Sequence, residues 1–215
     1  ILFVTLFSYY FYYKSSGFYF FLLAVITTSD YFIAEAIGRI KGDSDVKTRK
    51  MKMLMVASLC IDLGFLAYFK YTNFFAGLIA DLIGKNFQPW DIFLPVGISF
   101  FTFQSMSYVI DVYRGKIKPL GSLMDYAFYV SFFPQLVAGP IVRATDFAPQ
   151  IRKPVVITRE MFARGVYFIM IGLFKKAVIS DYISLNFVDR IFDNPTLYSG
   201  FENLLGVYGY AMQIY

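Results

Sequence analysis

The sequence predicts an all-α protein that crosses a lipid bilayer several times. Apolar residues make up 58% of its 215 residues and charged residues only 16%, whereas a soluble domain is about 45–50% apolar and about 25% charged. Several apolar runs reach the roughly 17 to 25 residues that a transmembrane helix needs. Basic residues gather in alternate connections, as expected of cytoplasmic loops. No polar stretch is long enough for a second, soluble domain, so we expect residues 1–215 to form a single membrane domain.

Composition excludes several classes of function. The chain has no histidine and a single cysteine, Cys60, which removes most zinc sites, every histidine-assisted nucleophile and any disulfide within the chain. We expect Cys60 to be buried filler. Phosphate-binding, dinucleotide-binding and nucleophile-elbow motifs are absent from the sequence, and the net charge of +5 suits anionic lipid headgroups. We therefore expect no metal, bound cofactor or nucleic acid.

Three apolar segments open the chain. Residues 1–13 lack the basic flank and cleavage site of a signal peptide, and residues 18–37 and 53–69 are each long enough to cross. The loop between the second and third segments is basic, which places it in the cytoplasm. Its basic residues are Arg39, Lys41, Lys47, Arg49, Lys50 and Lys52.

The next connection is expected to lie at the outer face. Residues 74–83 form an amphipathic piece that is too short to span and suits the membrane interface, as does Trp90. A fourth span, residues 94–113, then returns inward with Pro95 in its first turn. A basic group follows it, which agrees with the assigned orientation.

Residues 125–140 are apolar but interrupted by Pro134 and closed by Gly139 and a second proline. Basic connections flank this stretch on both sides, so a single crossing would place one of them outside. We infer a re-entrant or broken helix, because non-helical backbone at membrane depth is tolerated when protein surrounds it or when it lines a cavity. Ser122 and Asp125 are expected to form its capping box.

A further span starts at Thr158, the expected N-cap, and runs to residue 179. An acidic loop outside the membrane follows, with Asp181, Asp189, Asp193 and Glu202. The last segment, residues 201–215, is shorter than a crossing. We expect the chain to be truncated at both ends.

Polar residues recur on one face of the fourth span, at intervals of three and four residues. They either wall a cavity and hydrogen-bond a substrate, or hold neighbouring helices together. Asp111 and Arg114 are spaced to pair at the interface. The face consists of Gly97, Phe100, Gln104, Ser107 and Asp111.

Other polar groups in apolar segments have the same two interpretations. Lys175 and Lys176 either extend their amines to an interface or face a tunnel, and Gln135 is a further candidate for a cavity group. For Asp30 and Glu35 we favour solvation at the helix end or pairing with the basic loop. Asp62 is more central, and either function or a contact with a neighbouring hydroxyl would explain it.

Two long motifs identify a family. Residues 94–117, LPVGISFFTFQSMSYVIDVYRGKI, and residues 125–151, DYAFYVSFFPQLVAGPIVRATDFAPQI, resemble the central signature of the membrane-bound O-acyltransferase family. Residues 68–75 and 172–181 agree with it. The alginate O-acetyltransferase branch is the most similar, and the D-alanyl transfer protein of teichoic acid synthesis is a near neighbour.

The resemblance implies a ring of helices around a tunnel through a thinned bilayer, of which this chain would be an incomplete part. It implies transfer of an acyl group, with acetyl favoured, from a cytoplasmic thioester donor to hydroxyls of an exported polysaccharide such as alginate, in the inner membrane of a bacterium. The donor would be acetyl-CoA or an acyl carrier protein, and periplasmic acetylation proteins are possible partners. The functional histidine of the family lies downstream of Tyr215, so we assign no catalytic residue and expect the chain alone to be inactive.

Within this resemblance, the candidate residues fall into two groups. Those that would line the tunnel or contact substrate are Gln104, Ser107, Asp111, Gln135, Lys175 and Lys176. Those that would dock the donor or a carrier protein are Arg114, Arg143, Arg152 and Lys153. The alternatives are D-alanyl transfer to teichoic acid, a transporter or channel component, and a purely structural scaffold.

Overall fold

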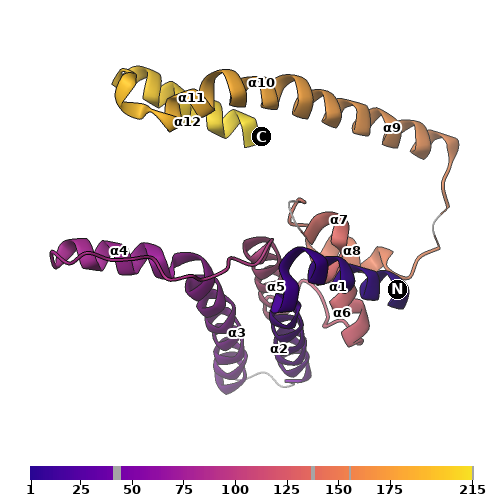
Figure 1. Ribbon diagram of the computed structural model, residues 1–215. Helices are drawn as coiled ribbons and strands as arrows, with labels where there is room; N and C mark the ends of the chain where they lie inside the picture. The colour runs from indigo at the N-terminus through magenta and orange to yellow at the C-terminus, as the bar shows by residue number, and fades with distance from the viewer. Residues whose placement is uncertain (41–44, 137–138, 155, 215) are drawn as a thin grey trace. The chain divides into compact units, whose positions relative to one another are not determined.

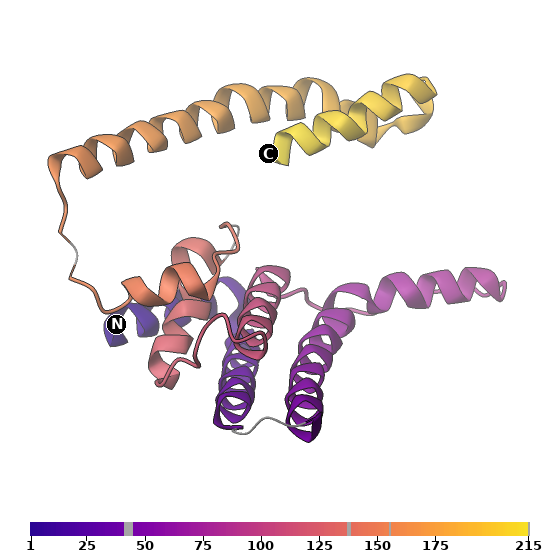
Figure 2. The ribbon, with the colours of Figure 1, turned by 180° about the vertical axis from the view of Figure 1, so that it is seen from behind.

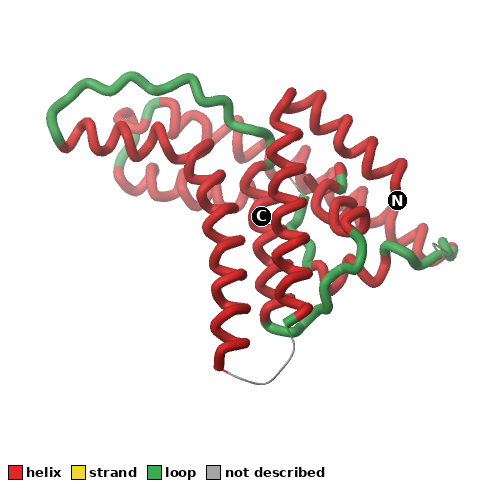
Figure 3. Tube along the Cα trace, turned by 90° about the horizontal axis from the view of Figure 1, so that it is seen from below, coloured by secondary structure: helices red, strands yellow, loops and turns green. Residues whose placement is uncertain are grey.

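The computed structural model describes residues 1–40, 45–136, 139–154 and 156–214, and these residues form helices and loops without a strand (Figures 1 and 3). The all-α prediction is confirmed. The chain divides into two compact units, Ile1–Lys153 and Pro154–Tyr215.

The core of the first unit is a bundle of three helices, α2 (Phe20–Arg39), α3 (Asp45–Leu66) and α5 (Ile98–Tyr113), each of which packs against the other two (Figure 1). Leu23, Ile26 and Phe101 are completely buried between them. At about 1.5 Å per residue, α2 and α3, with 20 and 22 residues, match a hydrocarbon core about 30 Å thick.

Two bends set the shape of the long apolar helices. Helix α1 (Leu2–Ser16) joins α2 through the 3₁₀ turn η1 (Gly17–Tyr19), where Gly17 has a φ of 59° that favours glycine. Helix α3 continues through the π-helical turn η2 (Ala67–Tyr71) into α4 (Thr72–Leu82), which runs across the direction of α3 (Figure 1). Among the described residues, two helical runs are long and apolar enough to cross a membrane, Leu2–Arg39 and Thr48–Leu82.

Helix α4 confirms the short helix expected over residues 74–83. The chain returns from its end as an extended segment, and the Asn73 side chain holds that segment by two hydrogen bonds to the backbone of Trp90, at 2.9 and 3.0 Å. Most of the apolar side chains of α4 are exposed, Leu82 among them.

Two boundaries predicted from the sequence were wrong. Helix α5 begins at Ile98, after Pro95, because Gly97 adopts a left-handed φ of 71° that ends the preceding extended segment. Helix α3 begins at Asp45, so residues 47–52 of the expected basic loop lie on its first two turns. Lys41 falls outside the described residues.

Residues 125–140 contain a broken helix, as expected. Helix α6 (Leu123–Ser131) stops at Phe132, and the short helix α7 (Phe133–Leu136) follows it. Helix α8 (Ala144–Phe147) and the turn η3 (Ala148–Gln150) come next. The expected capping box was wrong, because the Ser122 side chain makes no cap hydrogen bond and Asp125 pairs with Arg152 instead.

The second unit is a long helix with a second helix folded back on it. Thr158 caps the N-terminus of α9 (Arg159–Phe174) as predicted, since its hydroxyl accepts a hydrogen bond from the Met161 N–H at 3.2 Å. The helix continues through η4 (Lys175–Ser180), α10 (Asp181–Ile183), η5 (Ser184–Val188) and α11 (Asp189–Asp193). After the turn η6 (Pro195–Leu197), helix α12 (Gly200–Ile214) packs back against η5 and α11 (Figure 2).

The acidic loop predicted after residue 179 was therefore wrong, because Asp181, Asp189 and Asp193 lie on this continuous helix. Residues 173–194 contain neither glycine nor proline, and Pro195 is the first residue that stops the helix. Glu202 lies in the first turn of α12.

Candidate functional site

The break between α6 and α7 frees backbone groups that side chains from other elements satisfy. The Tyr129 carbonyl accepts hydrogen bonds from the Gln104 amide at 2.8 Å and from the Gln135 amide at 3.2 Å. The Phe133 N–H donates to the Ser8 hydroxyl of α1 at 3.3 Å. Three elements, α1, α5 and α7, thus supply the partners that an unbroken helix would have supplied itself.

This arrangement is enclosed by protein. Gln104 is 3% exposed, Gln135 is 8% exposed and Tyr129 is completely buried. The Tyr129 hydroxyl donates to the Val142 carbonyl at 2.8 Å, which fixes the chain after the break to the helix before it. The structure therefore brings together two of the predicted site residues, Gln104 and Gln135, on one carbonyl oxygen.

Gly139 lies so close to the backbone of α7 that no side chain fits there. Its N–H donates to the Gln135 carbonyl at 2.9 Å, and a Cβ atom at this position would lie 2.3 Å from the Gln135 Cα. That distance is a backbone clash that no rotamer change relieves. The motif that contains Gly139 thus has a steric reason for its glycine.

The remaining polar residues of the α5 face make other contacts. The Ser107 hydroxyl donates to the Gln104 carbonyl of its own helix at 2.8 Å. Asp111, 5% exposed, pairs with Lys116 at 3.7 Å instead of the expected Arg114. Phe100 is 39% exposed, so the face predicted from periodicity is not a single continuous wall.

Of the predicted docking residues, Arg152 has a structural partner. Its guanidinium donates to both Asp125 carboxylate oxygens, at 2.9 and 3.0 Å, which ties the end of the first unit to the first turn of α6. The hydrogen bonds and the charge of Asp125 raise the pKa of Arg152. Arg114, Arg143 and Lys153 are exposed and form no ion pair within the part of the chain that the structure describes.

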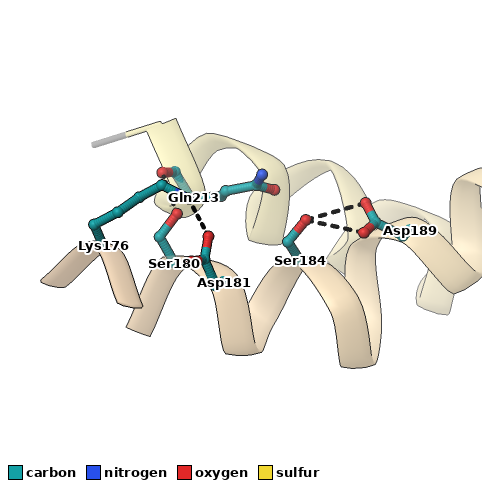
Figure 4. A network of polar contacts seen from close by, with 6 residues as sticks. All are labelled: Lys176, Ser180, Asp181, Ser184, Asp189 and Gln213. Atoms are coloured by element: carbon teal, nitrogen blue, oxygen red, sulfur yellow. Dashed lines mark hydrogen bonds and ion pairs between the residues drawn. The ribbon is translucent and has the colours of Figure 1, made fainter. Parts of the chain in front are cut away.

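Lys175 and Lys176 border a hollow of about 390 Å³ between η4 and α12. Both side chains are exposed. The Lys176 amine pairs with Asp181, one turn further on, and the Ser180 hydroxyl donates to the Gln213 carbonyl at 3.1 Å (Figure 4).

Sequence reasoning missed a second buried polar group, in the three-helix bundle. Asp30 is completely buried and accepts a hydrogen bond from the Ser58 hydroxyl at 2.6 Å, so its expected solvation at the helix end was wrong. Glu35 does pair with the basic Arg39, at 3.2 Å. The signal in the sequence was the spacing of Ser58 and Asp62, four residues apart on one face of an apolar helix.

The same spacing explains Cys60, whose expected burial was wrong. Since Ser58 and Asp62 face the bundle core, Cys60 lies between them in sequence and faces outward, where it is exposed.

Comparisons with known proteins agree on one family. The model of the MBOAT, membrane-bound O-acyltransferase family, matches residues 118–201. A protein named probable alginate O-acetylase, from Pseudomonas aeruginosa, is 37% identical over 185 residues, which are 83% of this chain and 35% of the relative. The peptidoglycan O-acetyltransferase of Helicobacter pylori is 30% identical over 212 residues, which are 86% of this chain and 39% of that protein.

The teichoic acid D-alanyltransferase of Bacillus subtilis is 29% identical over 134 residues, which are 59% of this chain and 32% of that protein. No solved structure matches the chain at a significant level. The chain spans about a third of the length of the curated relatives that it matches, 35% in the case of the first.

Proposed function

Because the chain belongs to the membrane-bound O-acyltransferase family, we propose that the whole protein transfers an acetyl group from a cytoplasmic thioester to hydroxyls of an exported polysaccharide. The acceptor hydroxyl oxygen attacks the thioester carbonyl, the carbon–sulfur bond breaks, and the thiol leaves with the proton of the hydroxyl. The donor is acetyl-CoA or an acyl group on a carrier protein. Alginate or a similar glycan is the acceptor that the names of the relatives support best.

The observation that carries this proposal is the broken helix α6–α7. Its freed backbone groups are held by buried side chains, those of Gln104, Gln135 and Ser8. Non-helical backbone at membrane depth needs such partners or a cavity. In the proposal, residues 125–140 enter the membrane and return to the cytoplasmic side, and they form part of the wall of the passage where donor and acceptor meet.

The residues of this chain then shape and close the passage. In the first unit, Gln104 and Gln135 fix the wall, and Ser107 and Asp111 are the further candidates for its lining. In the second unit, Lys175 and Lys176 are candidates for contact with substrate. A dry passage protects the thioester from hydrolysis. Since the chain contains no histidine, the base that takes the acceptor proton belongs, in this proposal, to the rest of the protein.

The proposal also includes the membrane location of the protein and its partners. We place the protein in the inner membrane of a bacterium as a multi-pass protein, with both units in one membrane domain. The exposed basic residues Arg114, Arg143 and Lys153 suit an acidic donor or carrier protein on the cytoplasmic side, whereas Arg152 acts mainly through Asp125. Periplasmic proteins of polysaccharide acetylation are the expected partners on the other side.

The test uses the full-length gene in cells that make the acetylated polymer. Gln104→Leu removes the amide that holds the Tyr129 carbonyl, and it should lower the acetate content of the polymer by about tenfold, the equivalent of one lost buried hydrogen bond. Phe103→Leu, a change at an exposed neighbour on the same helix, is the control and should leave acetylation unchanged. Membrane levels of all variants are measured alongside.

If Gln104→Leu acetylates the polymer normally and is present at a normal level, the broken helix α6–α7 does not have the role in acetyl transfer that we propose for it. Unchanged polymer acetate after deletion of the gene would reject the acetyltransferase itself. D-alanyl transfer to teichoic acid is the second candidate, supported by the relative from Bacillus subtilis. Loss of D-alanine esters, instead of acetate, from the cell envelope would favour it.

A further inference from the structure

Two acidic side chains are buried side by side in the three-helix bundle. Asp30 of α2 and Asp62 of α3 are both completely buried, and Asp30 is hydrogen-bonded to Ser58, which lies one turn before Asp62 on the same face of α3. Neither forms an ion pair within the described residues. Two unpaired carboxylates at this depth would repel each other and would each lack solvation.

Asp30 is the member of the pair that accepts a hydrogen bond. Asp30 accepts from the Ser58 hydroxyl at 2.6 Å, and Ser105 of α5, completely buried as well, lies in the same bundle without a hydrogen bond to Asp30 among the described residues. Ser105 in turn accepts from the Tyr126 hydroxyl of α6 at 3.1 Å. The Ser58 hydroxyl thus donates to Asp30 Oδ1, whereas Asp30 Oδ2 has no hydrogen-bond partner among the described residues. A hydrogen bond from a hydroxyl stabilises the ionised form of a carboxyl group.

Asp62 has the opposite environment. Both of its carboxyl oxygens are buried and have no donor within the described residues. The Thr102 hydroxyl, also completely buried, has no partner either, and it lies on the inward face of α5 one turn before Ser105. A carboxyl group with no donor to accept from, beside a carboxyl oxygen, Asp30 Oδ2, that also lacks a donor, is placed to be a donor itself.

We infer that Asp62 carries a proton and donates it in a hydrogen bond to the Asp30 carboxylate, so that the bundle binds one proton between α2 and α3. The other titratable side chains near the pair are Tyr126 of α6 and Tyr108 of α5, and Tyr31 and Glu35 of α2 lie near Tyr108. None of them is a cation, so none replaces the proton. The proton links α2 to α3, and the hydrogen bond from Tyr126 to Ser105 links α5 to α6, the first part of the broken helix.

A proton held only by the folded protein makes stability depend on pH. While it stays bound, the free energy of unfolding decreases as the pH rises above the ordinary range of an aspartic acid, because the unfolded chain does not hold this proton. The unfolding temperature of the folded protein should then fall by about 3 °C for each pH unit through this pair.

The experiment measures thermal unfolding of the full-length protein in detergent at a series of pH values. Asp62→Asn keeps a donor in place of the acid, so it should fold and should lose about 3 °C per pH unit of the wild-type dependence. Asp81→Asn, at an exposed position on α4, should keep the wild-type dependence. The infrared spectrum gives a second measurement, since the carbonyl band of a protonated carboxyl group should be present in the wild type and absent from Asp62→Asn.

Two results would overturn the inference. One is a wild-type spectrum without a protonated carboxyl band, together with equal pH dependence in the wild type and Asp62→Asn. The other is a loss of wild-type stability when sodium is replaced by choline and divalent ions are chelated, which would make the occupant a metal cation. If Asp62→Asn fails to fold, the infrared band of the wild type at neutral pH decides alone, and its absence rejects the shared proton.

Discussion

The two units differ in where they place their apolar side chains. In the first unit, large residues such as Tyr12, Leu23, Phe101 and Tyr108 are completely buried. In the second unit, the buried apolar side chains among the described residues are Val188 and Ile191. The α9 helix of the second unit is exposed along nearly its whole length.

Polar residues account for this difference better than hydrophobicity does. The bundle helices of the first unit carry Asp30, Ser58 and Gln104 on their inward faces, and these form hydrogen bonds between helices. The ion pair of α9, Arg164 with Glu160, lies on the surface of a single helix. A helix that is apolar all round is stable in lipid or against further protein, so the second unit depends on an apolar environment that it does not provide for itself.

The sharpest test of this comparison is the removal of one phenylalanine from each unit. Phe101→Ala, at a completely buried position, should decrease the free energy of unfolding by about 3–5 kcal/mol, since it leaves a cavity in the bundle. Phe168→Ala, at a position 67% exposed in its unit, should decrease it by less than about 1 kcal/mol in detergent. Denaturant unfolding of the two variants measures both values, and equal losses would show that α9 packs as tightly as the bundle.

Glycine substitutions give the next largest difference. Gly139→Ala places a Cβ atom 2.3 Å from the Gln135 Cα. It should decrease the free energy of unfolding by about 2–3 kcal/mol and should abolish the acetylation activity proposed for the full-length protein. Gly165→Ala, in α9, meets nothing within 4 Å and should stabilise its helix by about 0.5–1 kcal/mol. Denaturant unfolding of the two variants measures both changes in the free energy of unfolding. An unchanged value for Gly139→Ala would mean that the backbone around Gly139 is loosely packed against Gln135.

The sequence predicted the parts of the fold that depend on local chemistry. The all-α class follows from apolar run lengths, the cap at Thr158 from a hydroxyl before a helical pattern, and the break near Phe132 from Pro134. The helix over residues 74–83 follows from a short amphipathic run. Each of these features is determined within one or two turns of chain.

The predictions from the sequence were wrong where the burial or the partner of a residue depends on contacts with residues distant in sequence. The burial of Asp30 depends on Ser58, which is 28 residues away in sequence, and the partner of Asp125 is Arg152, 27 residues away. The periodicity of the fourth span predicted Gln104 as a candidate. Its partner is the backbone carbonyl of Tyr129, and because every residue has a backbone carbonyl, the sequence could not indicate this contact. The acidic residues after residue 179 were predicted to form a loop because of their charge. The absence of glycine and proline from residues 173–194 was the better indicator, and it favours a continuous helix.

Helix caps offer a smaller contrast between the units. Thr158→Ala removes the side chain that accepts from the Met161 N–H, and it should decrease the free energy of unfolding by about 1 kcal/mol. Ser122→Ala is the matched change in the first unit, where the hydroxyl makes no cap hydrogen bond, and it should cost less than about 0.5 kcal/mol. Unfolding curves for the two variants measure the difference, and a larger loss for Ser122→Ala would reverse this assignment.

The smallest expected effect is a dependence of α12 on pH. Glu202 accepts hydrogen bonds from the Ser199 hydroxyl at 2.7 Å and the Ser199 N–H at 2.8 Å, and the Ser199 hydroxyl accepts from the Glu202 N–H, so the two residues form a capping box. These bonds lower the pKa of Glu202 below its ordinary value of 4.5. The stabilisation is therefore complete above that value and is lost as the pH falls through the lower pKa of the folded protein.

Hydrogen exchange of the first-turn amides of α12 measures this loss, and protection should decrease as the pH falls from about 6 to about 3, after correction for intrinsic exchange. Glu202→Gln should remove this pH dependence. Glu160→Gln, which changes an exposed glutamate paired with Arg164 on α9, should leave it in place. Unchanged protection of the wild type across this range would show that α12 is held by its packing on η5 and α11, as the bundle of the first unit is held by its core, and that the cap adds nothing measurable.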